Sequence, residues 1–393
     1  DAADPVAATA AALRGGVGSG RVIVVGWGKA AIGMAAGAVE ALGGLPGVVA
    51  TPTPGRAPPG IEVIAGEHPI PGPGSISGGH RLLEVAAAAG EGDTVLALIS
   101  GGGSACSEVP APGLSLDDLA ATTEALLRSG APITEINTVR RHLSGLKGGR
   151  LARVALPARV VTLILSDVAA GGFEDVAGGP TVPDPTTPAE ALGVLADRGL
   201  LSRVPDVVAA HLRSAPLPDR TGPWGPVRVV ADGARAAEAA RRTAADRSVP
   251  VRIITTKLTG EASEVGAKLA SPGVASGPGL LIAAGETTVA VSGTGRGGRN
   301  QELALAAGIA LERHERVVVA ALGTDGVDGP TPAAGGIGDA GTVMRGRRAG
   351  LDARAALGNH DSHGYLEAVG DTLYTGPTGT NVGDVVVVLT RPR

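Results

Sequence analysis

Short apolar runs alternate with alanine-rich segments of helical periodicity along the chain, and this alternation limits the folds open to it. Runs such as 21–25, 94–99 and 160–165 are apolar at nearly every position, which is typical of strands buried on both faces. Segments 32–42 and 115–129 repeat apolar residues at helical spacing. Such alternation predicts a parallel sheet covered by helices on both sides. We therefore expect an α/β protein, with a Rossmann-like doubly wound sheet domain and a second α/β domain.

A proline-rich segment marks the expected domain boundary. Four prolines fall within residues 214–226, a composition typical of a linker. We therefore predict an N-terminal domain over 1–215, a linker over 216–226 and a C-terminal domain over 227–393. Strands expected after the linker are 227–230, 251–255, 279–283, 287–292, 317–322 and 385–389.

Charge and cysteine content exclude several classes of function. The 393 residues carry 34 lysines and arginines against 38 acids, a net charge of −4, so no basic surface is expected to bind nucleic acid or an anionic membrane. No apolar run reaches the roughly 18 residues of a membrane helix. The single cysteine, Cys106, excludes a disulfide scaffold or a multi-cysteine zinc site, and the histidines show no zinc-binding spacing. We expect a cytoplasmic protein.

Glycines gather where the predicted strands end, which is where open α/β sheets bind ligands. The first such loop, 26–31, reads G-x-G-x-x-A, but Thr51 stands where a dinucleotide-binding fold would carry an acid. Lys29 falls in the first turn of the following helix, where a cation is unfavourable unless an anion binds there. This pattern favours a phosphate or carboxylate site over a solvated lysine.

Two further features of the first half carry candidate binding groups. Ser100-Gly101-Gly102-Gly103-Ser104 directly follows a buried strand, so its amides and hydroxyls could converge on an anion, unless the loop is merely a flexible tip. Cations cluster over 134–150, notably Arg140 and Lys147; the alternative is a basic helix end. Asp167 ends another buried strand and needs a metal, a base role or a salt bridge.

The second half has one strong polyphosphate candidate and one candidate metal site. The glycine loop 293–303 contains Arg296 and Arg299 and runs into a helix. Asp325 and Asp328 follow a strand and could hold a divalent ion together with phosphate oxygens, or form two Asp-Gly turns. The P-loop signature G-x-x-x-x-G-K-[ST] does not occur.

Long motifs in both halves resemble those of the class II glycerate 2-kinase family. Those in the first half are Val25–Ala31, Gly66–Pro71, Leu98–Ala105, Ser129–Arg140, Leu146–Ala152, Ser166–Val168 and Gly179–Thr187. Those in the second half are Leu258–Ala262, Gly285–Thr288, Gly295–Leu303, Gly323–Thr331 and Thr375–Asn381. The resemblance runs nearly end to end. It implies two α/β domains with an active cleft between them, and transfer of the ATP γ-phosphoryl group to the 2-hydroxyl of D-glycerate. Family members are sometimes labelled hydroxypyruvate reductases.

The resemblance also implies roles for individual residues. Three residues match positions of the family's active centre: Lys29, Asp167 and Arg299. Lys29 would neutralise negative charge, and Asp167 would orient or accept the proton of the attacking hydroxyl or hold Mg²⁺. Arg299 would bind phosphate or carboxylate. The further substrate or phosphate residues implied are Ser100, Gly101, Gly102, Gly103, Ser104, Asn137, Arg140, Lys147, Arg296, Asn300, Glu302, Thr378 and Asn381. The expected cofactors are ATP and Mg²⁺, with Asp325 and Asp328 as metal candidates. The expected partners are a small hydroxy acid and a nucleotide, and a homodimer is compatible with this interpretation.

Three departures from the family pattern keep a second interpretation open. Gly171 and Gly172 replace a pair of aspartates, Gly72 stands where relatives often carry aspartate, and Trp27 occupies a usually small position. The alternative is a repurposed member with another acceptor, or with non-kinase chemistry in the same anion-binding cleft. A nicotinamide-dependent reductase and a non-catalytic binding protein rank below both, since Thr51 argues against the first and the many charged groups against the second.

Overall fold

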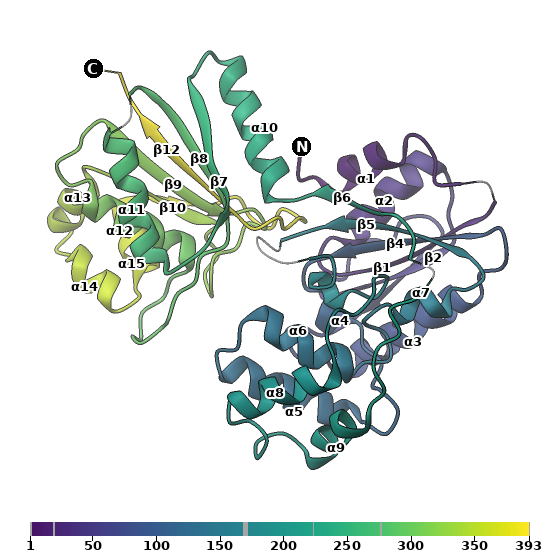
Figure 1. Ribbon diagram of the computed structural model, residues 1–393. Coiled ribbons are helices and arrows are strands. Elements are labelled where there is room, and N and C mark those ends of the chain that lie inside the picture. Colours follow the sequence, from purple (N-terminus) through teal and green to yellow (C-terminus); the bar gives the residue numbers. More distant parts are fainter. Residues whose placement is uncertain (1, 19, 168–171, 223, 276, 393) are drawn as a thin grey trace. The chain divides into compact units, whose positions relative to one another are not determined.

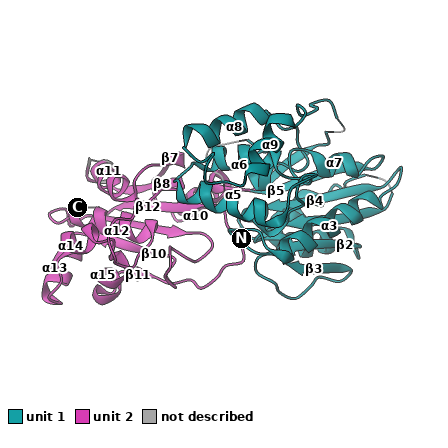
Figure 2. Ribbon diagram, turned by 90° about the horizontal axis from the view of Figure 1, so that it is seen from below, with its two compact units in different colours: residues 1, 3–165, 171–230 teal, residues 2, 166–170, 231–393 magenta. Residues whose placement is uncertain are grey.

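The computed structural model describes residues 2–392, apart from 19, 168–171, 223 and 276. The chain divides into two compact units, coloured in Figure 2. The first comprises Ala3–Leu165 and Gly171–Val230, and the second comprises Ser166–Ala170 and Ala231–Arg393.

A six-stranded sheet forms the centre of the first unit (Figure 1). Its strands are β1 (Val22–Trp27), β2 (Gly47–Thr51), β3 (Ile61–Ala65), β4 (Thr94–Ser100), β5 (Arg159–Leu165) and β6 (Val227–Ala231). Their order, β3-β2-β1-β4-β5-β6, is that of a dinucleotide-binding Rossmann sheet. The four pairings from β3 to β5 are parallel. β4 is buried at every position, as its aliphatic sequence predicts. The predicted Rossmann-like fold is therefore confirmed.

Helices surround this sheet and build a helical lobe beside it. The helices are α1 (Pro5–Leu13), α2 (Ala31–Leu42), α3 (Pro73–Ala87), α4 (Gly103–Cys106), α5 (Leu116–Arg128), α6 (Ile133–His142), α7 (Arg150–Val154), η1 (Val176–Gly178), α8 (Pro188–Asp197) and α9 (Asp206–Ser214). Leucines and valines of α5, α6, α8 and α9 pack into a core of their own. The structure thus adds a lobe that the strand–helix alternation did not predict.

The second unit is built on a mixed sheet (Figure 1). Its strands are β7 (Val251–Leu258), β8 (Gly279–Gly285), β9 (Val317–Gly323), β10 (Gly335–Asp339), β11 (Thr372–Leu373) and β12 (Asp384–Thr390), in the order β11-β10-β9-β12-β8-β7. β7 and β8 are parallel, whereas β12 runs antiparallel to both β8 and β9. The prediction of a second α/β region is confirmed.

Six helices of the described chain accompany this second sheet. They are α10 (Gly233–Asp246), α11 (Ala262–Ala275), α12 (Arg299–Ala310), α13 (Thr342–Arg348), α14 (Ala353–Gly358) and α15 (Ser362–Val369). From Asn300 to Gly308 every residue of α12 is buried. Leu303 joins the core under the sheet, while Leu305 packs with α13, α14 and α15. The first turn of α12, which carries the predicted polyphosphate arginine Arg299, is therefore fixed by packing on two sides.

Some expectations differ from the structure. The strand at 227–230 is β6, an edge of the first sheet, so segment 216–226 lies inside the first unit rather than ahead of the second. Residues 287–292 form no strand beyond a single bridge between Glu261 and Thr288, so that strand prediction was wrong. Cys106 is buried, and burial raises the pKa of its thiol to about 12. Within the described residues, none of the helices has the length and apolar character needed to span a membrane.

Candidate active site

Lys29 lies exposed in the turn between β1 and α2, two residues before the helix begins at Ala31. The prediction that it falls in the first turn of the helix was therefore wrong, because residues 28–30 form the turn that leads into α2. Its backbone N–H donates to the Gly101 carbonyl over 2.9 Å, which ties the first glycine loop to the second. Gly28 adopts a φ of 112°, and a Cβ there would meet the Ser100 carbonyl oxygen. Only glycine fits this close approach. The two loops predicted separately from the sequence are therefore one structure.

Two other basic side chains lie near Lys29. A Cβ placed on Gly102 would lie 3.1 Å from the Lys29 Cγ and 3.6 Å from the His68 Cδ2, so the two side chains flank the same glycine. Burial lowers the pKa of His68, and the charges of Lys29 and Arg140 lower it further. Burial also lowers the pKa of Arg140, whose guanidinium donates to the Ser104 carbonyl over 2.6 Å. We call Lys29, His68 and Arg140 the cationic cluster.

Buried polar atoms without partners lie in the same part of the fold. The Trp27 Nε1, the Ser104 Oγ and the Asn137 Oδ1 are buried and have no hydrogen-bond partner within the described structure. Trp27 is fully buried, and a Cβ on Gly103 would lie 2.6 Å from its ring. Asn137 uses its other amide atom, Nδ2, to donate to the Asp175 carbonyl over 3.0 Å. Because unpartnered buried polar atoms are costly, these three suit a polar ligand.

Two predicted binding residues are engaged inside the protein. The Ser100 Oγ accepts from the Ala30 N–H over 3.0 Å and lies 3.5 Å from the Trp27 carbonyl. Lys147 is fully buried, and its Nζ lies 2.5 Å from the Glu108 Oε2. Burial lowers the pKa of Lys147 to about 8, while Glu108 opposes that shift. Lys147 thus balances a buried acid, and we no longer assign it to a ligand.

The space of two expected carboxylates is occupied by neighbouring glutamates. A Cβ on Gly72 would lie 2.5 Å from the Glu67 Cδ, and Glu67 accepts from the N–H groups of Gly74 and Ser75 at the start of α3. A Cβ on Gly172 would likewise lie 2.5 Å from the Glu174 Cδ. Gly171 lies outside the described residues. The glycines at 72 and 172 therefore leave no vacant space where the aspartate side chains of relatives would lie.

In the second unit, Arg299 is held between two acids. Its Nε and Nη2 bind both oxygens of Asp384 at 2.7 and 3.0 Å, and its Nη1 lies 2.6 Å from the Glu286 Oε1. Burial opposes the charge, but Asp384 and Glu286 together raise the pKa of Arg299. Burial raises the pKa of Glu286, and the nearby charges of Asp167 and Asp384 add to that rise. We call Asp167, Glu286, Arg299 and Asp384 the acidic cluster.

Asp167 belongs to the second unit although it directly follows β5 of the first sheet. Asn381, a predicted binding residue, donates its Nδ2 to the Asp167 Oδ2 over 3.2 Å. Asp167 also lines a cavity of about 160 Å³ together with Asp232, Lys257 and the first residues of α10. This cavity brings one more cation, Lys257, near the acidic cluster, and it has room for a small anionic group.

The remaining candidates of the second half have different surroundings. Both carboxylate oxygens of Asp328 accept hydrogen bonds from Asn300 and Gln301, so Asp328 caps the start of α12. Glu302 contacts the His360 ring. The Asp325 Oδ1 accepts from the Val327 N–H over 3.2 Å. Arg296 and Thr378 are exposed and bond to backbone carbonyls.

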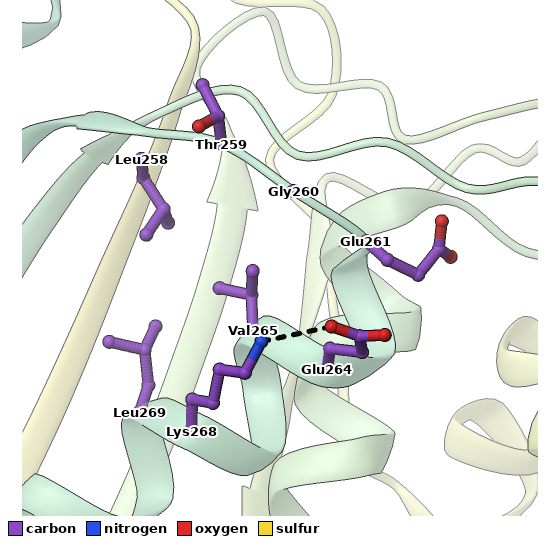
Figure 3. Close-up of a pocket in the computed structure, with 8 residues that line it drawn as sticks. All are labelled: Leu258, Thr259, Gly260, Glu261, Glu264, Val265, Lys268 and Leu269. Carbon is purple, nitrogen blue, oxygen red and sulfur yellow. Dashed lines mark hydrogen bonds and ion pairs between the residues drawn. The ribbon is translucent and has the colours of Figure 1, made fainter.

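A second cavity, of about 230 Å³, opens beside the start of α11 (Figure 3). Leu258, Val265 and Leu269 give it an apolar wall, and the ion pair between Glu264 and Lys268, at 3.0 Å, lies at its edge. A largely apolar lining with a few polar groups is a general feature of small-molecule sites.

Sequence reasoning missed several residues of these clusters. His68 and Glu286 stand within the motifs Gly66–Pro71 and Gly285–Thr288, so their positions were visible but their partners were not. Asp384 and Lys257 lie just outside the recognised motifs Thr375–Asn381 and Leu258–Ala262, so neither was picked out. Only the fold brings Asp384 to Arg299, across 85 residues of sequence.

Comparisons with known proteins agree with the two-part architecture. Residues 1–213 match the family model "Domain of unknown function (DUF4147)", and residues 279–384 match "MOFRL family". The chain is 42% identical to the D-glycerate 2-kinase of Thermotoga maritima, over 94% of this chain and 90% of that protein. It is 40% identical to a putative hydroxypyruvate reductase of Agrobacterium vitis, over 94% and 87%.

A solved structure is similar over nearly the full length. The crystal structure of the Thermotoga maritima glycerate kinase aligns with a TM-score of 0.89 and 40% identity, covering 99% of this chain and 96% of that one. Both names that the motifs led us to expect, glycerate kinase and hydroxypyruvate reductase, thus occur among the relatives. By its motifs, its two matched family models and these similarities, the chain belongs to the class II glycerate 2-kinase family.

Proposed function

We propose that the protein transfers the γ-phosphoryl group of ATP to the 2-hydroxyl of D-glycerate or a closely related short hydroxy acid. Similarity to glycerate kinases over 94% of the chain is the observation that carries this proposal. The cationic cluster supports it, because phosphoryl transfer depends mainly on positioning and on neutralising negative charge.

The cationic cluster would hold the anionic part of the acid. Lys29 is exposed, whereas Arg140 and the unpartnered atoms of Ser104 and Asn137 are buried. A carboxylate on the cations would leave hydroxyl groups of the acid to these polar atoms, which offer both a donor and an acceptor. The Trp27 N–H would add a further donor. The first unit would thereby select a small hydroxylated anion.

Asp167 would receive or orient the proton of the attacking hydroxyl. Its carboxylate is held by Asn381, and Lys257 lines the same cavity. Arg299 would bind the phosphoryl group with its guanidinium. Its positive charge is already balanced by ion pairs with Asp384 and Glu286, which also hold the side chain in place. The proposal assigns these groups and the cationic cluster to one reaction.

The acidic cluster also fits Mg²⁺ better than the predicted pair does. Asp328 caps α12 with both oxygens, so it has little capacity for a metal. The charge of Asp167 adds to the rise in the pKa of Glu286, and a divalent cation would relieve that repulsion. The described residues contain no group of three or more acids, histidines or cysteines that could hold a metal, so phosphate oxygens of the nucleotide would have to complete the Mg²⁺ site. We therefore assign Mg²⁺, which neutralises phosphate charge when bound, to Asp167 and Glu286, with Asp325 retained as an alternative ligand.

The nucleotide base would occupy the cavity beside α11 (Figure 3). A Val265→Trp substitution fills that cavity and is expected to raise KM for ATP while KM for the acid stays unchanged. Val274→Trp on the exposed end of the same helix is the matched control. Equal KM values for ATP in both variants would place the base elsewhere.

The decisive experiment measures ADP formation by the full chain with ATP, MgCl₂ and D-glycerate. We expect ADP to form only when the acid is present and to disappear in Lys29→Ala. A lack of turnover with D-glycerate and a panel of short hydroxy acids would contradict the kinase proposal.

The alternative is a family member with a different acceptor, and Trp27 favours it. A fully buried indole beside Gly103, whose N–H has no partner among the described residues, would reshape the acid-binding region. Trp27→Ala is expected to change which acid is preferred. Restoring aspartate at 172 tests the other departure, and it should be combined with Glu174→Ala because the two side chains would collide. Unchanged activity in that double variant would remove the reason for the alternative at this position.

A further inference from the structure

Three side chains of the second unit form a hydrogen-bonded relay that the kinase proposal does not use. The Ser292 Oγ lies 3.2 Å from the His360 Nε2, and the His360 Nδ1 lies 3.0 Å from the Glu302 Oε2. Ser292 is exposed, whereas the side chains of His360 and Glu302 are 14% and 3% exposed. Serine, histidine and carboxylate follow one another with a different ring nitrogen at each contact.

The carboxylate of Glu302 favours one direction for the relay. An ionised carboxylate can only accept, so the neutral tautomer that donates to Glu302 carries its proton on the His360 Nδ1. In that tautomer the Nε2 is unprotonated and accepts from the Ser292 hydroxyl. A nucleophile within 2.6–3.2 Å of a base that is itself oriented by a third group is the geometric signature of an activated serine.

The backbone holds the relay in place. His360 follows α14 with a φ of 56°, and the N–H groups of Thr294 and Gly295 bind Asn359, the residue before it. A Cβ on Gly293 would meet the Asn359 backbone, so the chain beside Ser292 approaches this turn as closely as glycine permits. Glu302 is fixed in the buried first turn of α12. The three side chains are thus positioned by three separate segments.

Two further features suit acyl transfer. The N–H of Gly293, the residue after the serine, makes no hydrogen bond to any described part of the chain, and an N–H at that position can stabilise an oxyanion. Val291, the residue before the serine, is 70% exposed and offers an apolar contact for a short acyl chain.

From these contacts we infer that Ser292 is a nucleophile, activated by His360 and Glu302, that accepts acyl groups from short-chain esters. The Ser292 Oγ would bond to the ester carbonyl carbon as its proton passes to the His360 Nε2. The carbon–oxygen bond to the alcohol would then break, and the alcohol would leave with that proton. Water would next attack the acyl-serine, giving its proton to the Nε2, and the serine would recover a proton as the acid departs. Glu302 would be a positioning residue, since it acts through His360.

The test uses the full chain with an alkyl fluorophosphonate and with p-nitrophenyl acetate. We expect one phosphonate per chain, mapped to Ser292 by mass spectrometry, and a burst of p-nitrophenol. Ser292→Ala should lose both, whereas Ser202→Ala, which removes another exposed serine, should keep both. His360→Asn should slow acylation by about 10²-fold or more.

Glu302 needs a measurement that a purely structural role would not explain. Glu302→Gln should slow acylation, and Glu302→Asp should restore part of the rate, with circular dichroism confirming that both variants fold. Labelling spread over several residues, or equal labelling of Ser292→Ala and wild type, would overturn the inference. So would a His360→Asn variant that acylates at the wild-type rate.

Discussion

The cationic cluster of the first unit and the acidic cluster of the second arise from similar sequence signals but have opposite electrostatics. Both cations belong to glycine-rich loops that lead into a helix: Lys29 lies two residues before α2, and Arg299 is the first residue of α12. Lys29 and Arg140 both lie near enough to His68 to lower its pKa, whereas Arg299 is bound by Asp384 and Glu286. The glycine loop and the cation therefore show where a site lies, while residues distant in sequence decide whether its charge is available to an anion.

This difference suggests a division of labour. A surplus of positive charge is suited to binding an anionic substrate, whereas carboxylates are suited to handling a proton or a divalent cation. The comparison depends on which charged side chains belong to each cluster. Variants that remove single charges test this membership, and the one with the largest expected effect comes first.

The first variant tests whether Lys147 is rightly left out of the cationic cluster. Lys147→Met would leave the buried carboxylate of Glu108 without its ion-pair partner, although Ser144 would still donate to it. Because breaking a buried pair is costly, we expect the free energy of unfolding to fall by about 3–5 kcal/mol in urea titrations. Arg128→Met, which removes an exposed cation, is the control and should change stability little. A stable Lys147→Met protein with impaired acid binding would return Lys147 to the cluster.

The second variant pair tests the division of labour itself. Lys29→Ala should lower kcat/KM for the acid by about 10²–10³-fold, mainly by raising KM, because a charge that holds the anion is lost. Asp167→Asn should lower mainly kcat, because it removes the group assigned to the proton. Steady-state kinetics with varied acid distinguishes the two patterns. If Lys29→Ala changed only kcat and Asp167→Asn changed only KM, the assignment of the clusters would be reversed.

Much of the fold could be predicted because local sequence determines it. The sequences of β1, β4 and β5 are apolar at nearly every position, so their burial can be predicted without knowing which strands they pair with. β10 was missed because its sequence, Gly335–Asp339, is mostly glycine, and pairing with β9 makes it a strand. Residues 287–292 were predicted as a strand from their β-branched residues, but in the structure they make only one bridge.

The candidate site was less predictable than the fold. Lys29 and the loop at 100–104 were recognised because glycines at strand ends are a local signal, and the structure joins them. Lys147 is paired with Glu108, 39 residues away in the sequence, and Arg299 is bound by Asp384, 85 residues away. Local patterns identify polar groups, but they do not show which of them are already paired.

The third variant asks whether Glu67, the acid adjacent to His68, offsets the cationic cluster. In the structure its carboxylate is used by the start of α3. Glu67→Ala should therefore cost about 1 kcal/mol of stability, measured by thermal unfolding, as is typical of a lost helix cap. Adding Gly72→Asp should restore that loss, because position 72 is the N-cap and the space is then vacant. Tighter acid binding in Glu67→Ala without any loss of stability would show that Glu67 acts on the cluster instead.

The smallest expected effect is a change in the pKa of His68. It measures the repulsion between the positive charges of the cationic cluster directly. Burial lowers the pKa of His68, and Lys29 and Arg140 lower it further. Removing the charge in Lys29→Met should therefore raise the His68 pKa, which histidine proton resonances report during an NMR titration. Arg128→Met, in the same unit but on the exposed face of α5, should leave the titration unchanged. Binding of an anionic acid to wild type should raise the His68 pKa in the same direction as Lys29→Met, because the ligand cancels the same repulsion. If neither the variant nor the ligand changed the pKa of His68, then His68 and Lys29 would not bind the same anion. The acid would then not bind at the cationic cluster of the first unit.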